Sequence, residues 1–399
     1  MILENFFVLT LIKVAVVAFV LLTTLAYLQW IERKVIAHVQ LRVGPYRVGP
    51  HGLLQPLADV VKLITKEGLI PSHVNRLFYL LAPFVAVALA LTSIAVIPFG
   101  PQITIGPVTT WMQLTDLRIG VLFVLAVSSI GVYGVALGGW ASNNKYSLLG
   151  GLRSSAQMIS YELPLALAVA APLLLTNTLD FRDIVNYQSG YWLGFIPRWN
   201  LFPEILGFIV FLIAGFAETN RVPFDLPEAE NELVAGFHTE YSSMNFAAFF
   251  MAEYANMVTV TAVATLLFLG GWTPPFPEPY SDFIPIILFA LAGLVALYHG
   301  LNPVRRMDKF TLPATALVFL GIAAIFGLSL FVPVAKAILM ALFWFCGKIL
   351  VLLFVFIWVR ATLPRFRYDQ LMRFAWTGLF PLSMFNLLVT SLVVALTSK

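Results

Sequence analysis

Long apolar runs, separated by short polar connections, make up most of this chain. Ten runs are long and apolar enough to cross a bilayer, for which a helix needs about 20 residues. They cover residues 6–30, 77–98, 119–138, 155–176, 203–217, 246–270, 284–301, 312–332, 336–359 and 376–397. The fifth and seventh runs are short. The pattern predicts an all-α polytopic integral membrane protein, one domain over residues 1–399, with about ten transmembrane helices.

Residues 53–66 follow a different pattern. Their apolar positions fall on one stripe of a helix and their charges fall on another face. The stripe consists of Leu53, Leu57, Val60, Val61 and Ile64, and the charges are Asp59, Lys62 and Lys66. Within the predicted cytoplasmic connection 31–76, we therefore expect an amphipathic helix that lies at the membrane interface and does not span it.

Lysine and arginine are distributed unevenly between the connections. The connections after the odd-numbered runs carry 17 of these cations, and those after the even-numbered runs carry 4. Because cytoplasmic connections are enriched in lysine and arginine, the odd connections are predicted to be cytoplasmic. With ten spans, both termini then lie on the non-cytoplasmic side of a bacterial cell (inner) membrane.

The composition removes several classes of function. The chain is 60% hydrophobic, and its one cysteine, Cys346, cannot provide an iron–sulfur cluster, a thiolate zinc site or an internal disulfide. The five histidines are too scattered to suggest a metal site. No GxGxxG or Walker motif is present, so the chain itself should bind neither NAD nor ATP in a standard site.

The net charge of +4 does not indicate nucleic acid, because the cations lie beside membrane spans. The first apolar run is too long for a cleavable signal, so we expect none.

The most unusual segment, residues 218–245, concentrates acids in an otherwise apolar protein. Six of the 20 carboxylates fall in 23 positions, with a single cation, Arg221, among them. They are Glu218, Asp225, Glu228, Glu230, Glu232 and Glu240. Crowded carboxylates repel one another and suit proton handling. A solvated acidic loop is the simpler interpretation, but the interleaved apolar residues, Val222 and Phe224 among them, favour a folded and partly buried segment.

Two further acids lie inside predicted spans. Glu162 belongs to the fourth run and Glu253 to the sixth. A carboxylate facing lipid costs on the order of 3 kcal/mol, so each should face protein or water. Glu162 is interpreted as a proton-relay or ligand-site acid, or else as a helix–helix hydrogen-bonding group. Glu253 is interpreted in the same way, or as an interfacial acid that reaches water. Together with Glu218, both could converge on one buried polar seam.

The first connection is basic, with Arg33, Lys34, Arg42 and Arg47 close together. Positive charge beside a span anchors a protein to the membrane surface. Docking of a soluble partner, or contact with a quinone or lipid headgroup, is the alternative interpretation. Lys348 lies near the middle of the ninth run, where a cation is harder to explain than one near a helix end.

Seven strings together make the chain resemble one family, the H subunits of bacterial NADH-quinone oxidoreductases (the complex I subunit 1 family). They occur in the family's order. The strings are Glu32-Arg-Lys, Arg42-Val-Gly-Pro, Gly52-Leu-Leu-Gln-Pro-Leu-Ala-Asp, Ser142-Asn-Asn-Lys-Tyr, Gln157-Met-Ile-Ser-Tyr-Glu, Glu218-Thr-Asn-Arg-Val-Pro-Phe-Asp-Leu-Pro-Glu-Ala-Glu and Arg360-Ala-Thr-Leu-Pro-Arg-Phe-Arg-Tyr-Asp-Gln-Leu-Met.

The resemblance implies a role that the residues alone do not give. Proteins of this family form much of the quinone chamber at the junction of the membrane arm and the soluble arm, and they couple quinone reduction to proton translocation. Each is part of an enzyme but not catalytic alone. The resemblance also implies that electrons arrive from FMN and iron–sulfur clusters in partner subunits, with quinone as substrate and no cofactor bound by this chain. The implied partners are soluble-arm quinone-site subunits on the cytoplasmic face, small membrane-arm subunits at the side, quinone and lipid.

Site residues are implied where this sequence matches the family's motifs. The quinone chamber and its mouth would include Arg33, Arg42, Asp59, Lys62, Glu218, Arg221, Asp225, Glu228, Glu230 and Glu232. The proton path would include Glu162, Glu218 and Glu253.

The chain departs from the family's pattern over residues 283–335. The runs 284–301 and 312–332 are interpreted as an added helical hairpin beside a family core of eight spans. In the alternative, run 284–301 lies in the interface, which inverts the last two spans. Two other functions remain open at this stage: the membrane subunit of a related hydrogenase-type complex, and a stand-alone ion-coupled transporter.

Overall fold

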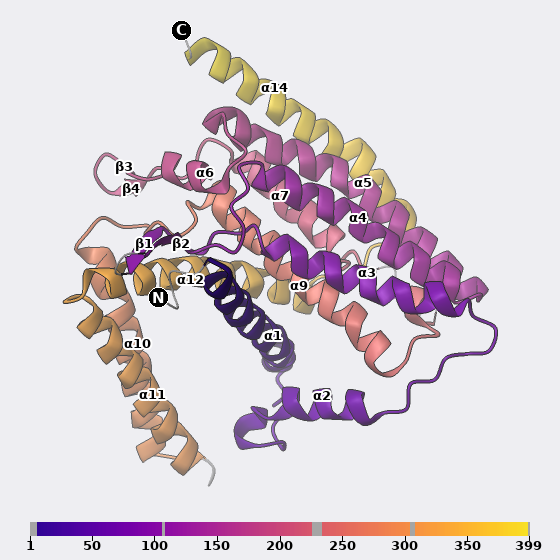
Figure 1. Cartoon of the computed structure of the whole chain (residues 1–399), viewed down its shortest axis with the longest axis horizontal. Helices are drawn as coiled ribbons and strands as arrows, with labels where there is room; N and C mark the ends of the chain where they lie inside the picture. Colours follow the sequence, from indigo (N-terminus) through magenta and orange to yellow (C-terminus); the bar gives the residue numbers. More distant parts are fainter. Residues whose placement is uncertain (1–5, 106–107, 226–233, 304–307, 398–399) are drawn as a thin grey trace.

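The computed structural model describes residues 6–105, 108–225, 234–303 and 308–397, and within these ranges it is almost entirely helical (Figure 1). Nine helices are long and apolar enough to cross a membrane within the described part of the chain. The fold class predicted from the apolar runs is confirmed. The long helices are α1 (Phe6–Val39), α3 (Arg76–Ile94), α4 (Gly120–Ala141), α5 (Lys145–Thr176), α9 (Ser243–Phe268), α10 (Tyr280–Leu301), α11 (Asp308–Ser329), α12 (Pro333–Thr362) and α14 (Phe380–Thr397).

The last span begins before α14. It runs on from α13 (Tyr368–Arg373) through a π-helical segment, η3 (Phe374–Leu379), as one apolar helix of 30 residues. The fifth apolar run forms α7 (Ile205–Glu218), a helix of 14 residues. At 1.5 Å per residue α7 is about 21 Å long, which is shorter than the hydrocarbon core of a bilayer. The ten predicted runs thus become nine long helices and one short helix in the described residues.

Short elements occupy the connections. The amphipathic segment predicted over residues 53–66 forms α2 (Gln55–Thr65), and its apolar stripe is exposed. Two small antiparallel hairpins and one extra helix were not anticipated. These elements are β1 (Gln102–Ile105) with β2 (Val108–Trp111), Gln102 opposite Trp111; β3 (Tyr191–Trp192) with β4 (Ile196–Pro197); α6 (Phe181–Tyr187); and the 3-10 turns η1 (Pro50–Gly52) and η2 (Gly236–His238).

The central bundle is formed by α3, α4, α5, α7, α9 and α14 (Figure 1). Glycine permits the closest approach between its helices. A Cβ atom on Gly134 of α4 would lie within 3.2 Å of the backbone of Ala86 in α3, and one on Gly139 would lie 2.9 Å from the Cα of Gly151 in α5. The core of the bundle consists of fully buried side chains such as Tyr161, Phe211 and Phe268.

Helices α10 and α11 form a pair that stands apart from the central bundle and contacts it through α12 (Figure 1). The two helices pack closely, since a Cβ on Gly293 would lie 2.8 Å from Leu320 and one on Gly300 would lie 2.7 Å from Pro313. The run 284–301 is therefore a helix of 22 residues, α10, in a hairpin with α11. That this hairpin is an addition to the family core stays a prediction.

The polar connections gather on two opposite faces of the bundle. On the face that we call the first, hydrogen bonds join the connections after α1, α4, α7, α10 and α12. They link Asn143 to His73, Tyr79 to Glu240, Arg365 to Asp225 and His51 to Thr311. These are the connections that carry most of the lysine and arginine, so the first face is the predicted cytoplasmic face.

The opposite, second face is also linked across connections. Its contacts join Lys13 to Trp111, Arg182 to Asp116, Tyr191 to Phe276 and Lys336 to Asp282. Hydrogen bonds from Arg182 to Asp180 and Asp116 raise the pKa of this arginine above its ordinary value. The alternating connections thus separate cleanly into two sides, as successive crossings of a membrane require.

The orientation of these faces can be measured with single cysteines in a Cys346→Ser background. Asn302 is exposed on the first face and Ser189 on the second. We expect a membrane-impermeant maleimide to label Asn302→Cys only in inverted vesicles and Ser189→Cys only in right-side-out vesicles. The opposite labelling pattern would reverse the predicted positions of both termini.

Candidate functional site

The segment that follows α7 is packed into the bundle as far as it is described. Val222, Phe224 and Asp225 are all less than one-tenth exposed. Gln157 of α5 anchors the segment, because its amide Nε2 donates to the carbonyl oxygens of Ala217 at 2.9 Å and of Phe224 at 2.8 Å. Val222 and Phe224 therefore do pack, as predicted, whereas Val234, farther along the segment, is exposed.

The chain after α12 closes over this segment. The Phe366 amide donates to the carbonyl oxygen of Pro223 at 3.1 Å. The Arg365 guanidinium donates to Oδ2 of the buried Asp225 at 2.9 Å. Two connections that are far apart in sequence are thus held together on the first face.

Arg221 forms the centre of a buried charge network. Its Nη1 lies 3.5 Å from Oε1 of Glu32 in α1, and its Nη2 lies 3.7 Å from Oε2 of Glu253 in α9. Arg360 of α12 also donates to Oε1 of Glu32. The hydroxyl of Tyr254 donates to Oε2 of Glu32 at 2.9 Å, and the Arg221 guanidinium lies 4.2 Å from the centre of the Tyr254 ring. The network joins α1, α9, α12 and the segment after α7.

Two further carboxylates each accept a hydrogen bond from a serine of α4, and the two serines are adjacent in sequence. Ser128 donates to Oε1 of Glu218, and Ser129 donates to Oε1 of Glu162. Because Ser128 and Ser129 are adjacent in α4, the carboxyl groups of Glu218 and Glu162 bond to neighbouring positions of that helix.

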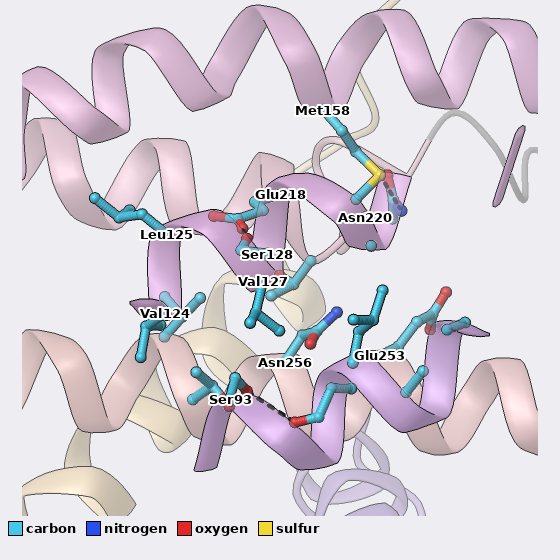
Figure 2. A pocket seen from close by; sticks show the side chains of 18 of the residues that line it. Ser93, Val124, Leu125, Val127, Ser128, Met158, Glu218, Asn220, Glu253 and Asn256 are labelled. Atoms are coloured by element: carbon cyan, nitrogen blue, oxygen red, sulfur yellow. Dashed lines mark hydrogen bonds between the residues drawn. The ribbon is translucent and has the colours of Figure 1, made fainter. Parts of the chain in front are cut away.

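A cavity of about 70 Å³ lies between Glu218 and Glu253. Glu218 and Ser128 line one side of it, and Glu253, Asn256 and Ser93 line the other (Figure 2). The spacing of Glu253 and Asn256, three residues apart in α9, places both on one helix face. Because one water needs about 10–15 Å³ of such volume, the cavity has room for several waters beside its polar groups.

The candidate residues near α2 form a separate, more exposed group. Nη1 of Arg33 lies 2.9 Å from Oδ2 of Asp59, and Nζ of Lys62 lies 3.5 Å from Oδ1 of the same aspartate. Arg42 lies apart from this group and bonds to Gln40 at 2.8 Å. Both the Arg33 and Lys62 side chains are exposed, so these ion pairs contribute little to stability.

Lys348 has a structural explanation. Its Nζ donates to the carbonyl oxygens of Leu269, Gly271 and Thr273 at 2.6, 2.9 and 2.7 Å. These carbonyls follow the end of α9, where a helix leaves its last carbonyl groups without internal partners. All three donors of the ammonium group are thereby used, so this buried cation holds the chain where it leaves α9.

The structure thus places Glu218 and Glu253 on the cavity and pairs Glu253 with Arg221. Glu162 bonds to Ser129, next to the Ser128 partner of Glu218, and Asp225 is held by Arg365. Arg33, Asp59 and Lys62 form the second group. Glu228, Glu230 and Glu232 lie outside the described residues.

Sequence reasoning missed Glu32, Tyr254 and Arg360 as site residues. Glu32 directly precedes Arg33 and Lys34, and a carboxylate beside two cations looks solvated in a sequence. In the structure it is only 4% exposed. The available signal was its position at the end of the first apolar run, where a helix can turn one side chain inward.

The arrangement is suited to binding and moving protons. Two carboxylates, hydroxyls and an amide line part of a mostly apolar cavity that can hold water, and the buried Arg221 pairs with one of the lining acids, Glu253. Among the described residues, no group of three or more histidine, cysteine or acidic side chains could hold a metal ion. Arg221 and the partly exposed Arg360 can instead attract a polar headgroup or a developing negative charge.

Comparison with known proteins gives a consistent result over nearly the whole chain. A family model described as NADH dehydrogenase matches residues 12–391. The chain is 67% identical to the NADH-quinone oxidoreductase H subunit 1 of Solibacter usitatus over 402 residues, covering 100% of this chain and 99% of that protein. It is 50% identical to the NADH-quinone oxidoreductase H subunit 2 of Koribacter versatilis, covering 98% of both chains. It is 43% identical to the NADH-quinone oxidoreductase H subunit of Protochlamydia amoebophila, covering 92% of both chains.

Removing the central cation should destabilise the fold. Arg221→Met takes away the positive charge between Glu32 and Glu253, and breaking a buried ion pair costs about 3–5 kcal/mol. We expect a clearly lower midpoint of thermal unfolding for the detergent-solubilised protein. Arg33→Met is the matched control, because its exposed ion pair with Asp59 should be worth no more than about 1 kcal/mol. Equal effects of the two substitutions would contradict a central role for Arg221.

Proposed function

This chain belongs to the NADH dehydrogenase family, and on that basis we propose that it lines much of a quinone chamber and couples quinone reduction to proton translocation. It is a multi-pass membrane subunit of an NADH-quinone oxidoreductase, the complex I type, and is part of an enzyme without being catalytic alone. Its partners are other subunits of the complex. The proposed membrane is the bacterial cell (inner) membrane.

The observation that carries the proposal is that Glu218 and Glu253 line one cavity, that Glu162 bonds to the serine next to the partner of Glu218, and that Arg221 pairs with Glu253. The three acids come from α5, the end of α7 and α9, and two of them line the same cavity. Carboxylates placed in a membrane protein at the cost of desolvation are typically retained for function. The serine hydroxyls that contact two of these acids, and the adjoining cavity, support a role in holding and passing protons.

The chamber mouth is proposed to lie at the first face, between α1, α2 and the segment after α7. Arg33, Asp59 and Lys62 lie there, and Arg42 lies in the same connection. The hydroxyl of Ser243, at the start of α9, donates to the carbonyl oxygens of Leu63 and Lys66 at 2.8 and 2.9 Å, which fixes the end of α2 against the bundle. The remaining chamber lining is proposed to consist of Glu218, Arg221, Asp225, Glu228, Glu230 and Glu232.

Reduction of a quinone to a quinol takes up two electrons and two protons. The electrons are proposed to come from FMN and iron–sulfur clusters of partner subunits, since this chain has one cysteine and no nucleotide-binding motif. Charge that develops on the reduced quinone changes the proton affinity of nearby carboxylates. The proposed coupling is that Glu218, Glu253 and Glu162 respond as an interacting group, so that their proton occupancy changes with each reduction.

The partners follow from the same proposal. Soluble-arm subunits that complete the quinone site would cover the first face, and small membrane-arm subunits would pack at the side of the bundle, with lipid around the rest. No nucleic acid is involved. The names of the three relatives favour this function over a hydrogenase-type membrane subunit. A stand-alone transporter has no supporting observation, since inverted repeats would be expected of it.

Glu218→Gln tests the proposed chamber acid. The amide cannot exchange a proton, so quinone-linked NADH oxidation by the assembled complex should fall on the order of tenfold or more. NADH reduction of an artificial acceptor that bypasses the membrane subunit should change little. A parallel loss of both activities would indicate misassembly and would remove support for the role of Glu218. Glu278→Gln, an exposed acid on the second face, is the matched control.

Glu162→Gln tests the proposed proton path. We expect fewer protons to be pumped per NADH oxidised in reconstituted vesicles, because the substitution removes one protonatable member of the interacting group. The measurement compares proton uptake with NADH consumption in the same sample. An unchanged ratio would exclude Glu162 from the path.

A further inference from the structure

A buried carboxylate that the proposed function does not use lies far from the central acids. Glu204 immediately precedes α7, at the opposite end of that helix from Glu218, and is only 1% exposed. Its neighbours Phe202 and Pro203 are exposed, which places Glu204 just beneath the second face. Between the two ends, the buried residues of α7 are apolar or glycine, including Val210 and Phe211. Glu204 is therefore separate from the central cavity.

The contacts of Glu204 come from α14. Nδ2 of Asn386 donates to Oε2 at 2.7 Å, and Oγ1 of Thr390 lies 2.5 Å from Oε1. Gly207 of α7 leaves room for this pairing, since a Cβ atom there would lie 3.0 Å from Asn386 Nδ2 and 3.1 Å from Glu204 Oε2. Although Glu204 is at the start of α7, its carboxyl group makes no capping hydrogen bond to that helix. The carboxyl group of Glu204 thus bonds to α14 and not to its own helix.

No cation compensates this carboxyl group among the described residues, where no lysine, arginine or histidine nitrogen is paired with it within 4.0 Å. Helix α14 carries no charged residue, α7 carries only Glu218, and α5 carries none after Glu162. The nearest cations along the neighbouring segments are occupied elsewhere. Arg198 lies 4.9 Å from the Tyr187 ring centre, and Lys348 is bound to three carbonyl oxygens. A permanently ionised carboxylate in this position would be costly.

The same heavy-atom positions can hold Glu204 either with a proton or without one, because the hydrogen bonds around it can be arranged in two ways. Oγ1 of Thr390 also lies 3.0 Å from the carbonyl oxygen of Asn386, and a threonine hydroxyl has one hydrogen. When Glu204 carries a proton, its hydroxyl donates to Thr390, and Thr390 donates to the Asn386 carbonyl. When Glu204 is ionised, Thr390 donates to Glu204 instead. Rotation of one hydroxyl group thus accommodates both states, while Asn386 Nδ2 donates to Oε2 in each.

We propose that Glu204, Asn386 and Thr390 form a proton-binding site of their own beneath the second face. The ligand is a proton delivered from the aqueous phase: the Glu204 carboxylate takes a proton from hydronium, which leaves water and a carboxylic acid, and the reverse step returns it. No other co-reactant is needed. Protonation removes an uncompensated charge from the contact between α7 and α14, so this contact responds to the acidity on the second side of the membrane.

Infrared difference spectroscopy on the intact complex in membrane films tests the site. On acidification of the wild type, we expect a C=O stretching band from a protonated carboxyl group, with a shift in D₂O and loss of the band on return to higher pH. Glu204→Gln should lose the amplitude of one carboxyl group per complex. The glutamine keeps the hydrogen bonds of the protonated state, so the protein should still assemble. Glu278→Gln, an exposed acid on the same face, should retain the band.

Thr390→Val provides a second measurement that leaves the carboxyl group in place. Because the partner hydroxyl is lost, the band of Glu204 should shift in frequency. Identical difference spectra for wild type and Glu204→Gln over the pH range in which the complex stays intact would overturn the proposal. If Glu204→Gln does not assemble, an unchanged band frequency in Thr390→Val would overturn it in its place.

Discussion

A charged side chain within a bilayer must be paired, fully hydrogen-bonded or neutral, and this constraint organises the whole molecule. The structure meets it differently at three places in the bundle. Arg221 is placed between the carboxylates of Glu32 and Glu253. Lys348 is surrounded by the carbonyl oxygens that follow α9. Glu204 is met only by the neutral side chains of α14. Each solution also ties together helices that are distant in sequence, so the groups that are hardest to bury fix the packing.

The short length of α7 connects these solutions. A helix of 14 residues cannot reach both surfaces of the bilayer, so the chain at each of its ends lies within the protein. On the first side, the segment 219–225 folds inward and delivers Arg221 to the network. On the second side, the preceding chain places Glu204 against α14. A longer fifth helix would have carried both of these groups out to the aqueous surfaces, where an arginine and a carboxylate need no partners.

The sequence predicted the helices far better than it predicted their polar contacts. Apolar runs are dictated by the solvent, so the spans and the amphipathic α2 could be located, although α1, α5 and the last span extend 8 to 10 residues beyond their apolar runs. The inward position of Glu218 and Arg221 was also predictable, because acids interleaved with Val222 and Phe224 have to pack.

Glu32 could not be identified in the same way, since only the tertiary structure brings Arg360, which is 328 residues away, to its carboxylate. Glu204 lies at the very start of the fifth apolar run and was not singled out, and the two α14 side chains that bury it, Asn386 and Thr390, are ordinary residues of an apolar helix. Lys348 was recognised as anomalous, but the carbonyl groups that explain it belong to backbone, which no residue pattern reveals.

The separation of Glu204 from Glu218 also limits where protons can travel in the proposed function. Among the described residues, the buried positions of α7 between its two ends are apolar or glycine, Val210, Phe211 and Ala214 among them, so α7 itself offers no side chain that can pass a proton. Helix α9 does carry buried hydroxyl groups, at Thr259, Thr261 and Thr265. The polar lining of the central cavity continues instead through Asn256, Thr259 and Ser93, toward α3 and α9. If the central acids transfer protons as proposed, the polar groups that line their cavity lead toward α3 and α9 and not along α7 to Glu204.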